Sequence, residues 1–201
     1  MRLWRIGWCG NRNALFRALR KTLYGPVPMD IRLATPADLP LLHPVIERAY
    51  RGDAARAGWT FESDLLAGPR TSLANLSAIL ASPADRLLVA LDDAATPVGC
   101  VQITDRGAGI AYLGLLCIDP ARQAGGLGRR LVATAQDHAA RLFAATTMEM
   151  TVIDSRVELI AWYQRRGYAL TGERRPFPIP LDPPLAMVVL AKALASADDL
   201  G

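Results

Sequence analysis

The stretch that decides the fold is Leu115–Leu131, which reads LLCIDPARQAGGLGRRL. Its first four residues are apolar and continue a run that begins at Ile110, which predicts a buried β-strand. Asp119-Pro120 ends this strand, and a glycine-rich turn leads into a helix from about Gly126. Glycines let a backbone approach a ligand closely, and the N–H groups at a helix N-terminus attract phosphate. The stretch therefore predicts a phosphate-binding turn between a strand and a helix.

Two common nucleotide-binding motifs are excluded by the spacing of these glycines. A Walker A loop needs GxxxxG followed by Lys-Ser or Lys-Thr, and neither pair follows the glycines here. A dinucleotide-binding fold needs GxGxxG in the first βαβ unit, whereas this turn comes late in the chain and has a different spacing. The turn is therefore expected to bind another kind of phosphate ligand.

The pattern on both sides of the turn predicts an α+β chain. The segment at 35–50 has Thr35 as a helix N-cap and Pro36 at the first helical position. Alternating and continuous apolar runs indicate strands, and apolar residues at helical spacing indicate helices. We expect strands at 31–34, 86–91, 98–104, 110–118, 147–153, 168–171 and 185–190, and helices at 35–50, 72–81, 126–143 and 157–166.

The composition is that of a globular domain in a reducing compartment. The 201 residues are 51% hydrophobic and 21% charged, which excludes a disordered or fibrous chain. The three cysteines are widely spaced and form no CxxC pair, which argues against a zinc site and favours a cytoplasmic location. The longest uncharged stretch, at 107–118, is too short to span a bilayer.

Residues 1–28 differ from the rest of the chain because they hold six basic residues and no acidic one. The remainder is close to neutral, so the net charge of +4 does not indicate nucleic-acid binding. This segment could be a targeting or membrane-surface helix, a helix that packs on the domain or a partner, or translated sequence upstream of a functional start at Met29. We expect a basic appendage at 1–28, a folded domain at 29–195 and a tail at 196–201.

The turn also resembles a known family. Gln123–Gly128 matches the Q/R-x-x-G-x-G/A signature of the GNAT superfamily of acyl-CoA-dependent N-acyltransferases. Ala161–Tyr168 looks like the A-x-Y-x-x-x-G-F/Y segment of that family, and the resemblance covers about 165 residues. It implies an α+β, three-layer fold with a mixed, mostly antiparallel sheet, helices on both faces and a splayed central strand pair.

The resemblance also implies a site for acetyl-CoA as co-substrate, with no metal. In this family the amides of the turn grip the pyrophosphate, and the pantetheine arm lies between the strands at 110–118 and 147–153. Tyr163 would protonate the leaving thiolate, although it could also be a core aromatic residue. The expected cofactor-binding residues are Leu116, Cys117, Ile118, Gln123, Ala124, Gly125, Gly126, Leu127, Gly128 and Arg129.

The general base is not assigned by the resemblance. Many family members carry a glutamate near the start of the central strand, where this chain has Tyr112. Deprotonation could instead use Glu62, Asp64 or Glu158, or a chain of waters, or precede binding.

The acceptor site is expected in two loops. In the family, the loop between the first two helices and the late hairpin frame the acceptor, which points to Trp59, Glu62, Arg174 and Arg175. An arginine can bind a carboxylate through two hydrogen bonds, so we hypothesise an amino-acid-like acceptor. Solvated charges on ordinary loops are the alternative.

We therefore expect an N-acetyltransferase that moves an acetyl group from acetyl-CoA to a primary amine of a small polar acceptor, directly in a ternary complex. No nucleic-acid or membrane partner is expected, and a homodimer is left open. A CoA-binding regulatory module without transfer activity is the alternative function. Tyr163 favours the enzyme, whereas the absence of the strand glutamate is compatible with the module. An RNA-associated protein is disfavoured because the basic charge is confined to the appendage.

Overall fold

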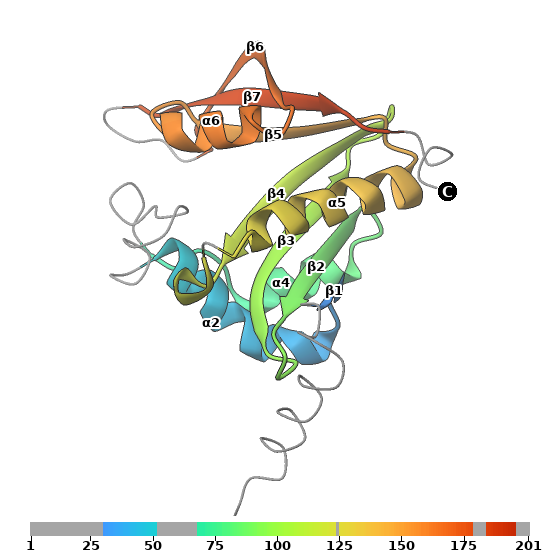
Figure 1. Ribbon diagram of the computed structural model, residues 1–201, viewed down its shortest axis with the longest axis vertical. Coiled ribbons are helices and arrows are strands. Elements are labelled where there is room, and N and C mark those ends of the chain that lie inside the picture. The colour runs from blue at the N-terminus through green and yellow to red at the C-terminus, as the bar shows by residue number, and fades with distance from the viewer. Residues whose placement is uncertain (1–29, 52–67, 124, 179–183, 196–201) are drawn as a thin grey trace, which may run out of the picture.

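The computed structural model describes residues 30–51, 68–123, 125–178 and 184–195. Its strands form one seven-stranded sheet in the order β1-β2-β3-β4-β5-β7-β6 (Figure 1). Only the β4–β5 pair is parallel, so the expectation of a mixed, mostly antiparallel sheet is confirmed. The strands are β1 (Asp30–Leu33), β2 (Asp85–Leu91), β3 (Pro97–Asp105), β4 (Ile110–Ile118), β5 (Thr147–Ile153), β6 (Ala169–Pro176) and β7 (Ala186–Ala193).

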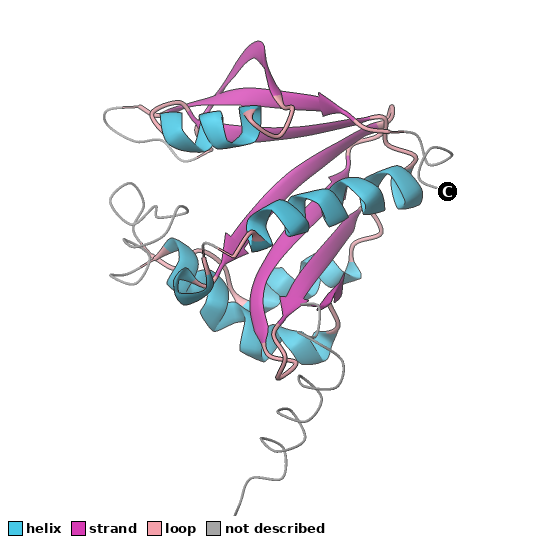
Figure 2. Cartoon of the chain, viewed as in Figure 1, coloured by secondary structure: helices cyan, strands magenta, loops and turns pink. Residues whose placement is uncertain are grey.

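Helices cover both faces of the sheet, as expected (Figure 2). α2 (Leu39–Tyr50) and α4 (Leu73–Ala81) pack on one face of β2–β4, where Leu42, Ile46 and Leu76 are fully buried. α5 (Leu127–Phe143) packs on the other face of β3 and β4. The apolar side of α6 (Val157–Gln164) belongs to the same core cluster as that of α5. These helices and the sheet form the three layers.

The C-terminal hairpin is longer than the sequence pattern predicts. The sequence pattern predicts a strand at 168–171, whereas β6 runs on to Pro176. Its side chains are almost all exposed, and this edge strand therefore lacks the alternation that marks a strand in a sequence. The register to β7 shifts between Leu170 and Arg174, a segment that includes Gly172 at φ +86°.

The central strands β4 and β5 diverge. They pair at only three positions, from Ile110–Thr147 to Tyr112–Glu149, and then separate (Figure 1). The carbonyl of Gly109 accepts hydrogen bonds from the backbone of the two residues at 146–147, at 2.8 and 3.1 Å, which ties the closed end. The expected splayed strand pair is therefore confirmed.

A bulge interrupts β4 where it leaves β5. One residue of β3, between Cys100 and Gln102, opposes two of β4, between Gly114 and Cys117. Leu115 lies inside this interval with φ +45°, a left-handed conformation that is costly for a leucine. An extra residue bends a strand and changes the direction of its side chains. The apolar run predicts burial on both faces, but the residues from 114 to 116 are only half-buried because they face the opening between the strands.

Candidate active site

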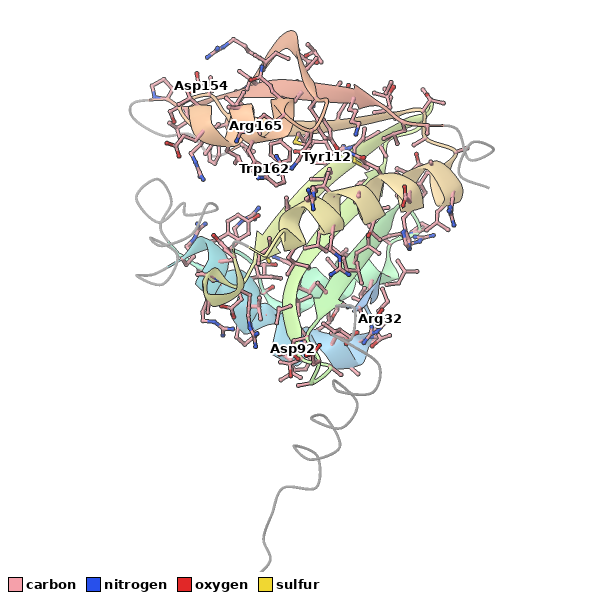
Figure 3. The ribbon with its side chains drawn as sticks, viewed as in Figure 1. Arg32, Asp92, Tyr112, Asp154, Trp162 and Arg165 are labelled. Carbon is pink, nitrogen blue, oxygen red and sulfur yellow. The ribbon has the colours of Figure 1, made fainter. Side chains whose placement is uncertain are left out.

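A cavity of about 840 Å³ opens between the diverging strands. Its walls come from β4 and β5, from the turn before α5, from α6, and from the end of α2 with the segment at 69–71. Figure 3 shows Trp162 reaching from α6 into the gap towards α5. The sheet therefore positions the cavity by leaving one edge of β4 without a strand partner beyond Tyr112 in the described residues.

The glycine-rich turn has the geometry that a phosphate ligand needs. Gly126 adopts φ +75° and is the N-cap of α5, and the space beside Gly125 is open. Arg130 donates the first helical hydrogen bond to the Gly126 carbonyl at 3.2 Å, so the N–H groups before it point out of the helix end. With the dipole of a 17-residue helix behind them, these donors can hold an anion.

Side chains fix the turn to the end of β4. The Gln123 amide donates to the Ile118 carbonyl at 3.3 Å. Asp119 accepts from the Ala121 N–H at 3.1 Å and from the Arg48 guanidinium at 2.6 Å. Gln123 thus connects the turn to the strand, which gives a physical reason for a glutamine at this place of the motif.

Gly128 faces inwards and has a packing role. A Cβ atom there would lie 3.0 Å from Ile118 Cδ1 and 3.5 Å from Trp162 Cζ2. The first turn of α5 can therefore lie against β4 and α6 because this position has no side chain. Gly126 has only the Arg129 guanidinium near its Cβ position, at 3.8 Å, and keeps an open surface.

The part of the cavity between the start of α5 and α6 is strongly basic. Arg129, Arg156 and Arg166 line it, and the Arg166 guanidinium lies 3.4 Å from the centre of the Trp162 ring. Arg166 also donates to the Trp162 carbonyl. Guanidinium groups around a helix N-terminus add to its attraction for phosphate.

Tyr163 is both packed and in contact with the cavity. Its ring meets those of Trp162 and Tyr168 edge-on, with centroids 4.9 and 5.7 Å away, and its side chain lines the cavity. Burial raises the pKa of the Tyr163 hydroxyl above its ordinary value, while Arg166 and Arg156 oppose the shift. In the described part of the chain, this hydroxyl has no hydrogen-bond partner, and it keeps its proton at neutral pH.

Tyr112, which stands where many family members have a glutamate, forms a hydroxyl pair with Thr151. Tyr112 lies 2.6 Å from the Thr151 hydroxyl, which joins β4 to β5 across the cavity, and the Arg106 guanidinium lies over its ring at 5.0 Å. Of the candidate bases, Glu158 is exposed and outside the cavity lining, and Glu62 and Asp64 lie outside the described residues.

The three expected contacts on β4 all line the cavity. The Leu116 carbonyl accepts a hydrogen bond from the Tyr50 hydroxyl at 2.8 Å. Cys117 is fully buried, and its Sγ lies 3.5 Å from that of Cys100, so the thiol is used in packing between β3 and β4. Ile118 packs against the first turn of α5.

The structure separates the two arginines that were expected at the acceptor. They are consecutive on β6, so their side chains point to opposite faces of the sheet. Arg174 pairs with Asp154, and Arg175 pairs with Glu173 at 2.7 Å and with Glu149 at 3.5 Å. Neither is among the described residues that line the cavity, so a role for one of them at the acceptor stays a prediction. Trp59, Glu62 and Ala124 lie outside the described residues.

Three residues that line the cavity were not among the expected site residues, namely Tyr50, Arg70 and Trp162. Trp162 is an unspecified position of the Ala161–Tyr168 motif, and the other two lie at the ends of the loop between the first two helices. Tyr50 ends a helix, and Arg70 lies in a turn-rich segment that the fold brings beside the β4 bulge. Their meeting depends on contacts between segments that are distant in the sequence.

Within the described ranges, no group of three His, Cys, Asp or Glu side chains could hold a metal ion. Among the helices that the structure describes, none is long and apolar enough to cross a membrane.

Comparison with known structures places this fold among N-acetyltransferases. The ribosomal-protein-S18-alanine N-acetyltransferase from Escherichia coli is 18% identical, with a TM-score of 0.64 over 84% of this chain and 95% of that one. The spermidine/spermine N-acetyltransferase SpeG from Vibrio cholerae is 16% identical, with a TM-score of 0.60 over 82% and 92%. The protein smu.2055 from Streptococcus mutans is 14% identical, with a TM-score of 0.65 over 83% and 100%.

At these identities the likeness shows a shared fold, and the family is shown by sequence. A search of curated proteins finds no match. The profile described as "Acetyltransferase (GNAT) family" matches residues 54–168, more than half of the chain. This match includes both motifs, at 123–128 and 161–168, and the strands that form the cavity. The chain therefore belongs to the GNAT acetyltransferase family.

Proposed function

We propose that this acetyltransferase transfers the acetyl group of acetyl-CoA to a primary amine of a small polar acceptor, directly within a ternary complex. The observation that carries the proposal is the meeting of three features in one cavity. These are the glycine-rich turn at the start of α5, the open edge of β4 and the Tyr163 side chain. The turn can hold a pyrophosphate, and the open edge of β4 can bind an extended arm that carries amides. The Tyr163 hydroxyl can supply a proton.

Binding of the donor follows from these surfaces. The N–H groups at the start of α5 and the side chain of Arg129 would hold the pyrophosphate. The pantetheine arm would then lie along β4, with its amides facing the backbone of the residues at 116–118. This placement would bring the thioester to the bulge, beside Tyr163.

The transfer itself needs one nucleophile and one acid. The amine nitrogen attacks the thioester carbonyl carbon, the C–N bond forms, and the carbonyl oxygen becomes an oxyanion. A backbone N–H at the β4 bulge would stabilise this charge, an effect typically worth about 3–4 kcal/mol. As the C–S bond breaks, Tyr163 gives its proton to the leaving thiolate, and the proton lost by the amine restores the hydroxyl. The products are an N-acetyl amide and free CoA.

The charge of the cavity bears on how the amine loses its proton. Every charged side chain among the described residues that line the cavity is an arginine. Nearby positive charges lower the pKa of an amine, because they disfavour its ammonium form. The acceptor would therefore react as the free base, with water or the Tyr112–Thr151 hydroxyl pair relaying the departing proton to the Tyr163 oxygen.

A CoA-binding module without transfer activity is the second candidate, and the observation that favours it is Tyr112 in the place of an acid. The two functions differ in turnover. An acceptor panel that follows the release of free CoA should show transfer to at least one amine. Binding of acetyl-CoA without turnover on any amine would favour the module.

The role of Tyr163 is tested by Tyr163→Phe. Loss of the proton donor should lower kcat by roughly 100-fold or more and leave acetyl-CoA affinity within about twofold. Tyr168→Phe is the matched control, because that hydroxyl is hydrogen-bonded to Gln136 at 2.8 Å and does not line the cavity within the described residues. If kcat is unchanged in Tyr163→Phe, and the chemical step is shown to limit the rate, then Tyr163 serves only in packing.

A further inference from the structure

We propose that the side chain of Tyr112, held across the gap between β4 and β5, limits the acyl group of the donor to the length of an acetyl group. The inference rests on the proposed acetyl transfer and names the residue that selects the acyl-CoA. Tyr112 and Thr151 carry hydroxyls that lie 2.6 Å apart, one on each strand. Both side chains line the cavity.

The hydroxyl pair stands where the two strands begin to separate. Tyr112 is the last residue of β4 that pairs with β5, opposite Glu149, and Thr151 is two residues further along β5. Figure 3 shows Tyr112 nearer than Trp162 to the end at which these strands meet. The hydrogen bond between the two hydroxyls therefore spans the end of the cavity at which the strands converge.

Three neighbours fix the ring of Tyr112. Its Cε1 atom lies 3.4 Å from the position that a Cβ atom of Gly114 would take, so the ring lies along β4 over a residue without a side chain. The Arg106 guanidinium lies 5.0 Å from the centre of the ring. The hydroxyl is bonded to Thr151, whose branched side chain has few rotamers. The ring is therefore in place before a donor binds.

The direction of the donor brings its acyl group to this ring. The turn that would hold the pyrophosphate follows the end of β4, so the pantetheine arm would run back along the strand, from Ile118 towards the bulge between Gly114 and Cys117. The acyl group lies beyond the sulfur, at the far end of that arm. It would therefore point from the bulge towards the ring of Tyr112.

The opposite wall at this end of the cavity is apolar and buried. Leu113 and Met150 line the cavity, are 4% and 2% exposed, and belong to the core cluster that α5 and α6 complete. Successive strand residues face opposite sides, so Tyr112 and Thr151 lie on the other face of the sheet. A longer acyl chain would have to displace either the ring or the core, and a packed core resists added methylenes. The pocket for the acyl group is therefore short.

The ring of Tyr112 also borders the proposed acid. Burial is the main cause that raises the pKa of the Tyr163 hydroxyl, and the nearby Tyr168 and Tyr112 add to the shift. Tyr163 reaches the cavity from α6 and Tyr112 reaches it from β4. A chain that extended past the ring would move the thioester away from Tyr163, so the ring sets the position of the reacting carbon as well as the length of the chain.

The experiment measures the affinity of the full-length protein for CoA thioesters of increasing length, without an amine, so that no transfer occurs. Calorimetry with acetyl-, butyryl- and hexanoyl-CoA gives one Kd for each thioester. We expect the wild type to bind acetyl-CoA at least about tenfold more tightly than hexanoyl-CoA, because a methylene that does not fit a pocket is rejected by about that factor or more. In Tyr112→Ala and Tyr112→Leu this preference should disappear or reverse, since each methylene that enters the vacated space adds roughly fourfold in affinity.

Tyr112→Phe is the matched control. It removes the hydroxyl but keeps the ring between Gly114 and the Arg106 guanidinium, so the ratio of the two Kd values should stay within about threefold of the wild-type ratio. Circular dichroism shows whether each variant is folded. Tyr112→Leu removes the ring while keeping an apolar side chain, so it carries the test if Tyr112→Ala does not fold.

Two outcomes would overturn this inference and leave acetyl transfer intact. In one, the wild type binds hexanoyl-CoA as tightly as acetyl-CoA. In the other, the folded Tyr112→Ala or Tyr112→Leu variant keeps the wild-type preference for acetyl-CoA. If the expected preferences are found but no amine causes release of CoA, the acyl pocket stands and the transfer fails. If no CoA thioester binds, both proposals fail.

Discussion

The two halves of the sheet are built differently. β1–β4 are enclosed by α2 and α4 on one face and by α5 on the other, whereas α6 is the helix beside β5, β7 and β6 in the described residues (Figure 1). Most of the largest fully buried side chains belong to the first half and α5, and only Met148, Met150 and Leu190 come from the second. We call β1–β4 with α2, α4 and α5 the frame, and β5–β7 with α6, which is the thinner part, the jaw. The cavity lies where β4 of the frame and β5 of the jaw diverge.

This difference separates stability from activity. A buried side chain of the frame that does not line the cavity, such as Leu42, contributes mainly to the free energy of folding. A side chain at the divergence of β4 and β5 contributes mainly to ligand binding and turnover. Three substitutions test this division, beginning with the largest effect.

Leu42→Ala should lower the free energy of unfolding by about 3 kcal/mol, because it leaves a cavity between α2 and the sheet. Denaturant unfolding measures the loss. The kcat of the folded variant should stay unchanged at low temperature. Leu170→Ala in the jaw is the control, since Leu170 is 48% exposed and its loss should cost less than about 0.5 kcal/mol. If kcat falls in Leu42→Ala while the protein stays folded, the separation of stability from activity is wrong.

Asp38→Asn should destabilise the frame by about 2 kcal/mol at neutral pH. The Asp38 carboxylate accepts hydrogen bonds from Arg32 at 2.8 and 2.9 Å and from the Thr35 N–H at 2.7 Å. The hydrogen bond from Arg32 is the main cause that holds the pKa of Asp38 far below its usual value, and burial opposes it. The unfolded chain therefore takes up a proton at a higher pH than the folded one.

The stability that Asp38 provides is thus present at neutral pH and is lost as pH falls below its ordinary carboxyl pKa. Unfolding curves of the wild type and Asp38→Asn should converge on acidification. For the control Asp93→Asn, at an exposed turn, the free energy of unfolding should differ from that of the wild type by a small amount that does not change with pH. If the free energies of unfolding of the wild type and Asp38→Asn differ by the same amount down to strongly acidic pH, the assigned ion pair is contradicted.

Gly128→Val should act where frame and jaw meet. The new side chain would overlap Ile118 and Trp162, so α5 must move away from β4 or α6. Overpacking of this kind costs about 1–3 kcal/mol, and we expect acetyl-CoA affinity to fall at least about tenfold. Calorimetry on the folded variant measures the change. Gly125→Ala is the control, because nothing lies within 4 Å of its Cβ position and affinity should hold.

The frame and the turn could be predicted from sequence because their signals are local. The strand, the turn and the helix from 110 to 143 are contiguous, so one stretch shows their order and their chemistry. β6 was predicted short because an exposed edge strand has no apolar alternation. The hypothesis that Arg174 or Arg175 binds the acceptor could not distinguish the two residues from sequence, whereas in the structure these neighbours on a strand point to opposite faces.

The cavity wall around Tyr50 and Arg70 could not be predicted in the same way. Arg70 faces the cavity because Glu47 fixes its backbone and Tyr50 directs its guanidinium, both from an earlier helix. Tyr50 reaches β4 only because the bulge brings the Leu116 carbonyl to its hydroxyl. These contacts join segments 20 to 66 residues apart, and no periodicity reports them.

Beyond Tyr112, one edge of β4 has no strand partner among the described residues, and this has a consequence for the lifetime of the protein. An edge strand carries N–H and C=O groups that bind water or another extended chain. A donor molecule that lies along this edge binds the folded protein and not the unfolded one. At a concentration 100 times its Kd, such a ligand adds about 2.7 kcal/mol to the stability of the fold. Since degradation in cells draws on the unfolded fraction, the abundance of this enzyme should rise and fall with the supply of its own donor.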